Sequence, residues 1–268
     1  MELANKTVVL THAANTLGRA LSKALAARGA RLVLSGTDEQ ILSQLMAQIP
    51  SDQHRLVVSD ISTEPGRVSL SDACQQGDRG VDILINNPLR GGQGLFRATS
   101  QSAINTYLNA HLNAPILLIR ALLPHLLKRD NSQIVNIGAL TGNIGLPGFA
   151  CDSAARFGLR GFSEALGREL SESPVKVIYF AHRGIKSGDA PSAGQLGAAL
   201  KRPLDSPENV SKALLRAMAD DRPFTQMGWR ERWWIKRNTL ARKKMDQAFE
   251  SQRPTFASSA RKKSFPER

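Results

Sequence analysis

Residues 6–35 read KTVVLTHAANTLGRALSKALAARGARLVLS, and this stretch decides the fold. Lys6–Thr11 is a short apolar run rich in β-branched residues, which is typical of a buried strand. Residues 17–28 have apolar side chains at helical spacing and end before Gly29, a residue type that commonly stops helices. A second apolar run, Arg31–Ser35, follows. This order of strand, helix and strand predicts a right-handed βαβ unit.

The alternation of strands and helices continues along the chain. Further strands are predicted at residues 56–59, 81–86, 133–137 and 175–181, and further helices at residues 38–49, 64–76, 101–128 and 153–172. Six or seven parallel strands wrapped by helices make an α/β fold, a Rossmann-type doubly wound parallel sheet. In such sheets the ligand crevice lies beyond the carboxyl ends of the strands.

Length and charge define the domains. The 268 residues suit a single domain at residues 1–221, a basic Trp-containing helical extension at residues 222–250 and a flexible tail at residues 251–268. Lys and Arg number 36 against 23 Asp and Glu, which gives a formal charge of +13. The last 47 residues hold 13 of these cations and 4 of the acids. The basic excess is therefore mostly a C-terminal property.

Several protein classes are not indicated. Only Cys74 and Cys151 are present, far apart, so we expect neither a disulfide framework nor a metal site. The N-terminus has no apolar core of a signal peptide, and no apolar run approaches the roughly 20 residues of a membrane span. We expect a cytoplasmic protein, with peripheral contact to a membrane as the alternative. The basic tail lacks a recognised nucleic-acid-binding motif, so nucleic-acid binding is not expected.

The order and spacing of the elements resemble the short-chain dehydrogenase/reductase (SDR) superfamily over roughly residues 5–187. The resemblance rests on Thr11 in the first loop, Asp60 after the third strand, Asn86-Asn87 after the fourth, Ile134–Ile137 in the fifth and the run FGLRGFSEAL at residues 157–166. It implies a NAD(P)-binding Rossmann fold of an oxidoreductase type. It also fixes a register in which each position of the family's site can be compared with this chain.

The first loop departs from the family's pattern, T-G-x-x-x-G-x-G, whose glycines let the backbone approach the cofactor pyrophosphate at a helix N-terminus. Residues 11–18 read THAANTLG, so His12 and Thr16 replace two of the three glycines. If His12 adopts a positive φ, the cost is on the order of 1–2 kcal/mol relative to Gly. The resemblance therefore leaves only vestigial cofactor-binding positions, which are Thr11, Gly18, Asp60 and Asn86.

The residues that select between NAD and NADP are missing as well. The family's ribose-binding acid or phosphate-binding Arg follows the second strand, where this chain has Gly36 and Thr37. Asp38 begins a helix, and we interpret it as an N-cap in preference to a ribose ligand. No cofactor is assigned, and any binding of NAD or NADP is expected to be weakened.

Catalysis in this superfamily uses an Asn in the long helix, a Ser after the fifth strand, and a Tyr and a Lys four residues apart on the next helix. The register places His111, Ala139, Asp152 and Arg156 there. Tyr normally protonates the developing alkoxide and Ser hydrogen-bonds the carbonyl, but Asp152 is an anion at neutral pH and Ala139 has no hydrogen-bonding side chain. The resemblance thus implies a pseudoenzyme that has lost the usual hydride transfer.

The replaced residues allow two interpretations. An i,i+4 salt bridge between Asp152 and Arg156 beside a partly buried, structural His111 is preferred. The alternative is an anion-binding or acid/base role, because a His beside a carboxylate can shuttle protons. Three functions remain open: a non-catalytic binding, regulatory or partner subunit; a divergent NAD(P)-dependent oxidoreductase of an apolar carbonyl or alcohol; and a peripheral membrane adaptor.

Two regions suggest partners. The helices near 101–128 and 153–172 keep apolar faces, so we expect a homo- or hetero-oligomer that associates through them. Residues 228–249 carry all three tryptophans among Arg and Lys. This composition predicts either packing over the crevice of the domain or contact with an anionic membrane surface.

Overall fold

The computed structural model describes residues 2–49, 51–75, 80–89, 94–186 and 204–250, without 245 and 248. Seven strands in these ranges form one parallel sheet in the order β3-β2-β1-β4-β5-β6-β7. They are β1 (Thr7–Leu10), β2 (Arg31–Gly36), β3 (Arg55–Val58), β4 (Ile83–Asn86), β5 (Ser132–Ala139), β6 (Val175–His182) and β7 (Phe224–Gln226). The doubly wound Rossmann-type fold is confirmed. The predicted tail at residues 251–268 lies outside the described residues.

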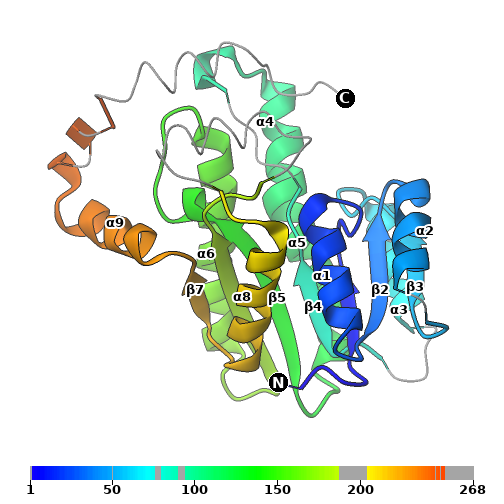
Figure 1. The fold of residues 1–268 in the computed structure, drawn as a ribbon. Coiled ribbons are helices and arrows are strands. Elements are labelled where there is room, and N and C mark those ends of the chain that lie inside the picture. The colour runs from blue at the N-terminus through cyan, green and yellow to red at the C-terminus, as the bar shows by residue number, and fades with distance from the viewer. Residues whose placement is uncertain are drawn as a thin grey trace.

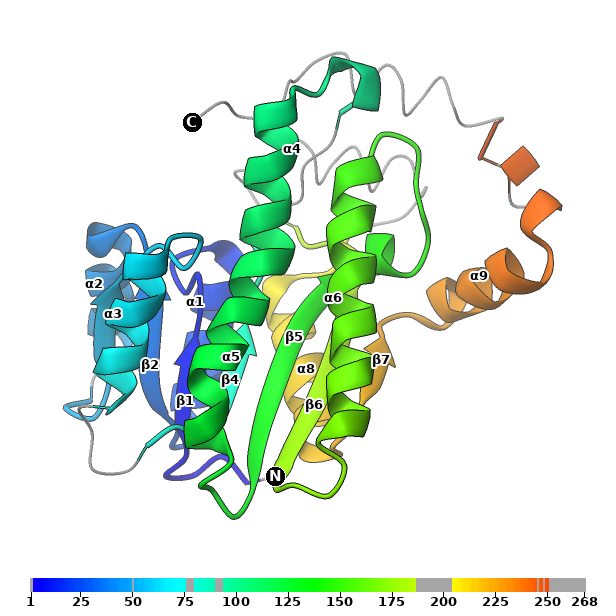
Figure 2. The same cartoon turned by 180° about the vertical axis from the view of Figure 1, so that it is seen from behind.

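Helices cover both faces of the sheet (Figures 1 and 2). One face carries α1 (Thr16–Ala26), α2 (Glu39–Gln48) and α8 (Pro207–Ala219); the other carries α3 (Glu64–Gln75), α4 (Gln101–Leu108), α5 (Ala114–Leu126) and α6 (Ala150–Glu169). Successive strand residues point to opposite faces, so Val8 joins the core under α1 whereas Val9 joins the core under α5. The nearly continuous apolar strands follow from this double burial.

The long helix predicted at residues 101–128 is interrupted. A π-helical segment, Asn109–Asn113, separates α4 from α5 and contains His111. Pro115, the second residue of α5, has no N–H to donate to the carbonyl of His111, which explains why regular α-helical bonding fails here. The π-helical segment lies beside the candidate site, because its His111 ring stacks on Tyr107.

The sheet also continues beyond the boundary expected at residue 221. After α8, residues Phe224–Gln226 pair in parallel with β6 and complete the sheet, and α9 (Trp229–Leu240) follows. The basic segment therefore begins with a strand of the domain. Gln226 is buried and accepts a hydrogen bond from Asn143 Nδ2 at 2.7 Å, which ties β7 to the loop after β5.

Candidate functional site

The carboxyl ends of β1 and β4 are joined by a dense set of hydrogen bonds. Asn87, just after β4, donates from its backbone N to Thr11 Oγ1 at 3.0 Å and from Nδ2 to the His12 carbonyl at 3.0 Å and Asn15 Oδ1 at 3.1 Å. His12 Nδ1 lies 2.8 Å from the Asn87 carbonyl oxygen. The first loop is thus fixed against the strand beside it by the chain's own polar groups.

The N-terminus of α1 is capped from within the same loop. The Gly18 N–H donates to Asn15 Oδ1 at 2.8 Å, and Asn15 Nδ2 donates to the Pro88 carbonyl at 3.0 Å. A Cβ on Gly18 would lie 2.6 Å from the His12 carbonyl oxygen, so close packing of helix and loop explains this glycine. His12 has a φ of 48°, the positive value that costs a non-glycine residue energy.

These residues do not fit a dinucleotide in the way a glycine-rich loop does. A pyrophosphate is normally held by free N–H groups at a helix N-terminus, and here the amide of Gly18 is already bonded to Asn15. On the ribose side, Asp38 caps α2 by accepting from the Ile41 N–H at 2.9 Å, as predicted, and Asp60 accepts from the Ser62 N–H in its own turn at 2.9 Å.

Asn86, the last vestigial position, takes part in a buried chain of side chains. Its Nδ2 donates to Asn136 Oδ1 at 2.8 Å, and Asn136 Nδ2 donates to Ser163 Oγ at 2.9 Å. These two hydrogen bonds connect β4, β5 and α6 across one face of the sheet. The Oδ1 atoms of Asn86 and Asn87 are buried without a hydrogen-bond partner in the part of the chain that the structure describes.

The predicted pair of Asp152 and Arg156 forms the centre of the site. Arg156 Nε donates to Asp152 Oδ1 at 2.8 Å, and both side chains are buried, with 6% of the Arg156 surface and 3% of the Asp152 surface exposed. Tyr107 donates a short hydrogen bond to the same carboxylate oxygen, and Thr141 donates another to Oδ2. Burial alone would raise the pKa of Asp152, but the Arg156 charge and these hydrogen bonds together lower it.

The two flanking histidines are neutral. The His111 ring stacks on Tyr107 with centroids 4.1 Å apart, and His182 is the last residue of β6, paired with Ala139 in the sheet. Burial, together with the Arg156 charge, lowers the pKa of each imidazole to about 3. Nδ1 of each ring is buried and has no hydrogen-bond partner among the described residues. The structure therefore brings His111 near Asp152 but does not join them by a hydrogen bond.

Ala139 is the last residue of β5, because this strand extends two residues past its expected end by pairing with β6. Beneath it, Tyr179 fills the space beside two glycines: a Cβ on Gly138 or Gly142 would lie 2.0 or 2.3 Å from Tyr179 Oη. Tyr179 Oη donates to the Arg156 carbonyl at 3.3 Å, and burial raises the pKa of this tyrosine to about 12. Tyrosine is thus present near the site, but as a buried packing residue.

Three residues of the site were not predicted from the sequence: Tyr107, Thr141 and Tyr179. Tyr107 lies four residues before His111, on a helix already expected to border the site, and Thr141 lies two residues after Ala139. These two spacings are the signals in the sequence that could have identified Tyr107 and Thr141. The sequence separation between Tyr107 and Asp152 is 45 residues, so only the packing of α4 against α6 brings them together.

The basic extension covers part of the loop after β5. Trp234, Ile235 and Phe249 pack on a buried cluster made of Leu140, Ile144, Leu146 and Phe149. Trp229 and Trp233 do not share this packing and are 68% and 51% exposed. Of the three tryptophans, Trp234 packs in this cluster on the domain, and the predicted covering of the crevice stays a prediction.

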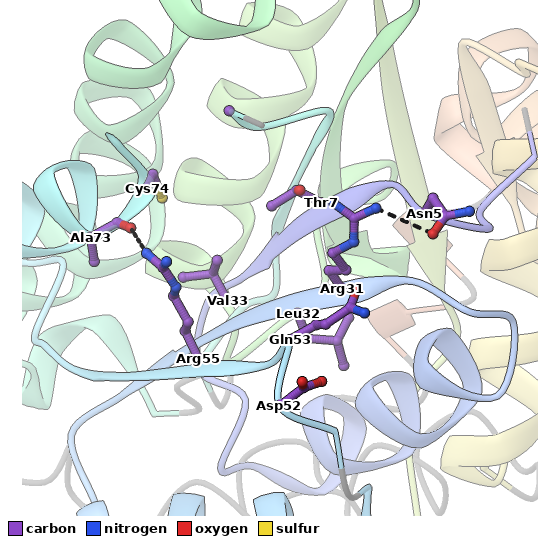
Figure 3. A pocket seen from close by; sticks show the side chains of 11 residues that line it. Asn5, Thr7, Arg31, Leu32, Val33, Asp52, Gln53, Arg55, Ala73 and Cys74 are labelled. Carbon is purple, nitrogen blue, oxygen red and sulfur yellow. Dashed lines mark hydrogen bonds between the residues drawn. The ribbon is translucent and has the colours of Figure 1, made fainter. Parts of the chain in front are cut away.

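A separate pocket of about 380 Å³ lies at the opposite, amino end of β1–β3 (Figure 3). Arg31 donates to Asn5 Oδ1 at 3.2 Å there, and Arg55 donates to the Ala73 carbonyl at 3.3 Å. No residue of the candidate site lines it. In the described ranges, no group of three His, Cys, Asp or Glu side chains could hold a metal ion. The same ranges contain no helix with the length and apolarity that crossing a bilayer requires.

The comparisons with known proteins agree with this fold. The chain is 32% identical over 192 residues to dehydrogenase/reductase SDR family member 7C of Xenopus tropicalis, a match that covers 69% of this chain but only 62% of that relative. Nodulation protein G of Rhizobium sp. (strain N33) is 31% identical over 186 residues, with 69% of this chain and 76% of the relative covered.

Solved structures match over a larger share of the chain. A short chain dehydrogenase/reductase from Burkholderia phymatum in complex with NAD superposes with a TM-score of 0.79 at 19% identity, covering 92% of this chain and 96% of that one. This likeness concerns the fold. Residues 6–193 match the family described as short chain dehydrogenase. With most of the sheet, its connecting helices and the candidate site inside that match, the chain belongs to the short-chain dehydrogenase/reductase superfamily.

Proposed function

We propose that this chain has lost the NAD(P)-dependent hydride transfer of its superfamily and acts as a non-catalytic binding, regulatory or partner subunit. The observation that carries the proposal is the buried ion pair of Asp152 and Arg156. In the register of the superfamily, these residues stand where the proton-donating Tyr and its Lys are expected. An ionised carboxylate accepts protons and cannot supply one to a developing alkoxide.

The surroundings of Asp152 support this proposal. Its carboxylate accepts hydrogen bonds from Tyr107, Thr141 and Arg156, and its pKa is lowered, so the group stays ionised at neutral pH. The Arg156 fork is turned toward Asp152, and its pKa is raised, so it stays a cation. The charges of Asp152 and Arg156 thus neutralise each other in a buried ion pair. Ala139 offers no hydroxyl to a substrate carbonyl.

The first loop supports a loss of cofactor affinity. Asn15 Oδ1 accepts the hydrogen bond from the Gly18 N–H, which could otherwise donate to a phosphate oxygen. Asn87 holds His12 and Asn15 in place from the other side. A pyrophosphate approaching α1 would have to displace these bonds and the Thr16 side chain at the start of the helix.

Calorimetric titration of the purified protein with NADH and with NADPH tests the proposal. We expect no binding in the micromolar range, while an NAD-binding member of the superfamily titrated in parallel gives a normal isotherm. Micromolar binding of either nucleotide, together with turnover of any carbonyl substrate, would refute the loss of function. Binding without turnover would instead place the loss at the Asp152 position alone.

A second candidate function, a divergent oxidoreductase or polar-ligand binder, rests on the unpartnered buried atoms. Within the described ranges, Nδ1 of His111 and of His182, and Oδ1 of Asn86 and of Asn87, have no hydrogen-bond partner. Buried polar atoms normally find a partner, so a water or a polar ligand in the crevice would satisfy them. Consumption of NADPH with aliphatic ketones that is abolished by His111→Phe would favour this function over the first.

We also propose that the subunit associates through α4, α5 and α6. Phe157 on α6 is 41% exposed although it is large and apolar, and Leu108 and Leu112 nearby are only partly buried. Native mass spectrometry of the full chain tests this. A pure monomer at micromolar concentration would contradict it, and a dimer that Phe157→Asp dissociates would support it.

A further inference from the structure

Helix α9 lies at the edge of the sheet beyond β7 and stands apart from the helices that cover the two faces (Figures 1 and 2). Its sequence, WRERWWIKRNTL, contains four cations and one acid. The exposure of its residues alternates with helical spacing, which gives the helix an inward face and an outward face.

The inward face holds α9 in a fixed orientation. Glu231, the only acid of the helix, is 3% exposed, and its charge acts on the nearby Arg183. Gly228 precedes the helix with a φ of 85°, and a Cβ there would lie 1.8 Å from Glu231 Oε2. Trp234 and Ile235 pack on the apolar cluster of the loop after β5. Rotating the helix to hide its outer side chains would break all these contacts.

The outward face combines large apolar side chains with positive charge. Trp229, Trp233 and Leu240 are 68%, 51% and 84% exposed, and their spacing places them on one side of the helix. The guanidinium of Arg230 lies 5.0 Å from the Trp229 ring centroid, and that of Arg237 lies 5.2 Å from the Trp233 ring centroid. Because Glu231 points inward, no carboxylate of α9 offsets these cations on the outer side.

We propose that the outward face of α9 binds the surface of an anionic lipid bilayer. Indole rings are stable at the level of lipid headgroups, where their apolar body is buried and their N–H remains hydrated. Arg and Lys beside them meet the negative headgroups, each cation contributing roughly a fivefold gain in partitioning near such a surface. The exposed Lys243 and Lys244 continue the positive surface past the end of the helix, where Arg242 Nε lies 3.9 Å from Asp246 Oδ2.

This inference goes beyond the proposed non-catalytic role and does not depend on it. The outward residues of α9 take no part in the cluster around Asp152, so nucleotide binding and membrane binding can fail or succeed separately. We choose a bilayer as the binding partner of this face because exposed Trp and Leu side chains beside Arg and Lys match an interface that is apolar inside and anionic outside.

Flotation of the full-length protein with vesicles tests the proposal. With vesicles of phosphatidylcholine and phosphatidylglycerol we expect co-flotation that is lost with phosphatidylcholine alone and weakened by added salt. Arg232→Glu with Lys236→Glu should lower partitioning at least tenfold. The control, Lys212→Glu with Arg216→Glu on the exposed face of α8, changes the net charge equally and should have a much smaller effect. If both pairs of substitutions lower flotation equally, the proposal that α9 is the binding site is overturned.

The tryptophans provide an independent readout. In a Trp234→Phe variant, Trp229 and Trp233 are the only indoles left in the chain. Brominated phosphatidylglycerol vesicles should quench their fluorescence and shift it to shorter wavelength. Trp229→Ala with Trp233→Ala should reduce flotation, whereas Phe96→Ala, at another exposed aromatic residue, should not. Flotation that persists without these two tryptophans, or unquenched fluorescence in the floated protein, would overturn the proposal.

Discussion

Replacing Arg156 by Met removes the positive charge bonded to the buried Asp152 carboxylate. The carboxylate would keep its hydrogen bonds from Tyr107 and Thr141 but would lose the ion pair at 2.8 Å. Breaking a buried pair from one side leaves an uncompensated charge, so we expect the free energy of unfolding to fall by about 3–5 kcal/mol at pH 7. Met is used because it fills a similar volume without a charge.

The double variant Asp152→Asn with Arg156→Met separates charge from packing. The introduced asparagine could still bond Tyr107 and Thr141, and neither buried charge remains, so much of the loss should be recovered. Urea unfolding of the wild type, both single variants and the double variant gives the coupling energy. If the single variants each lose less than about 1 kcal/mol and add in the double variant, the buried ion pair is not what holds this site together.

The pH dependence has a defined sign. Because the pKa of Asp152 is lowered in the folded wild type, its contribution to stability is present above the unfolded pKa of about 3.9 and is lost as the pH falls through the folded value. In Arg156→Met, burial without the cation should raise the pKa of Asp152. This variant should then gain stability as the pH falls through the raised value, and a parallel pH profile in both proteins would refute the reasoning.

Three further predictions concern the loop and the histidines. Gly18→Ala should destabilise the fold by about 2 kcal/mol or more in urea unfolding, because its Cβ would lie 2.6 Å from a backbone oxygen, and a neutral effect would contradict the packing. His12→Gly with Thr16→Gly should raise NADH affinity in calorimetry by about fivefold or more, equivalent to about 1 kcal/mol, because the Thr16 side chain no longer stands at the start of α1, and unchanged affinity would exclude this loop as the cause. His111 and His182, whose pKa values burial lowers to about 3, should remain neutral by NMR between pH 7 and about 4, and stability should fall as the pH drops below about 6.5, where the unfolded imidazoles take up protons.

The parts of this structure that the sequence predicts are those governed by local rules. Short apolar runs, separated by helical stretches, predicted the strands, because strands that are buried on both faces consist almost entirely of apolar residues. Asp38 was interpreted as an N-cap from its place before a helical stretch, and its side chain does cap α2. The ion pair of Asp152 and Arg156 was predicted because residues four apart on a helix are neighbours.

The parts that the sequence did not predict depend on contacts between distant segments. Tyr107 and Thr141 bond Asp152 only because α4 and the loop after β5 pack against α6. The strand β7 has only three residues and takes its conformation from pairing with β6, so its own pattern is too short to reveal it. The division of the tryptophans between the two faces of α9 depends on where the domain holds Glu231 and Trp234.

The buried ion pair of Asp152 and Arg156 and helix α9 both contact the loop after β5. Thr141 in this loop donates to the Asp152 carboxylate, while Leu140 beside it belongs to the cluster on which Trp234 packs. The same loop therefore contacts both the buried carboxylate and α9. The loop after β5 thus lies between a buried ion pair and a basic helix, and neither of these two contacts involves a substrate.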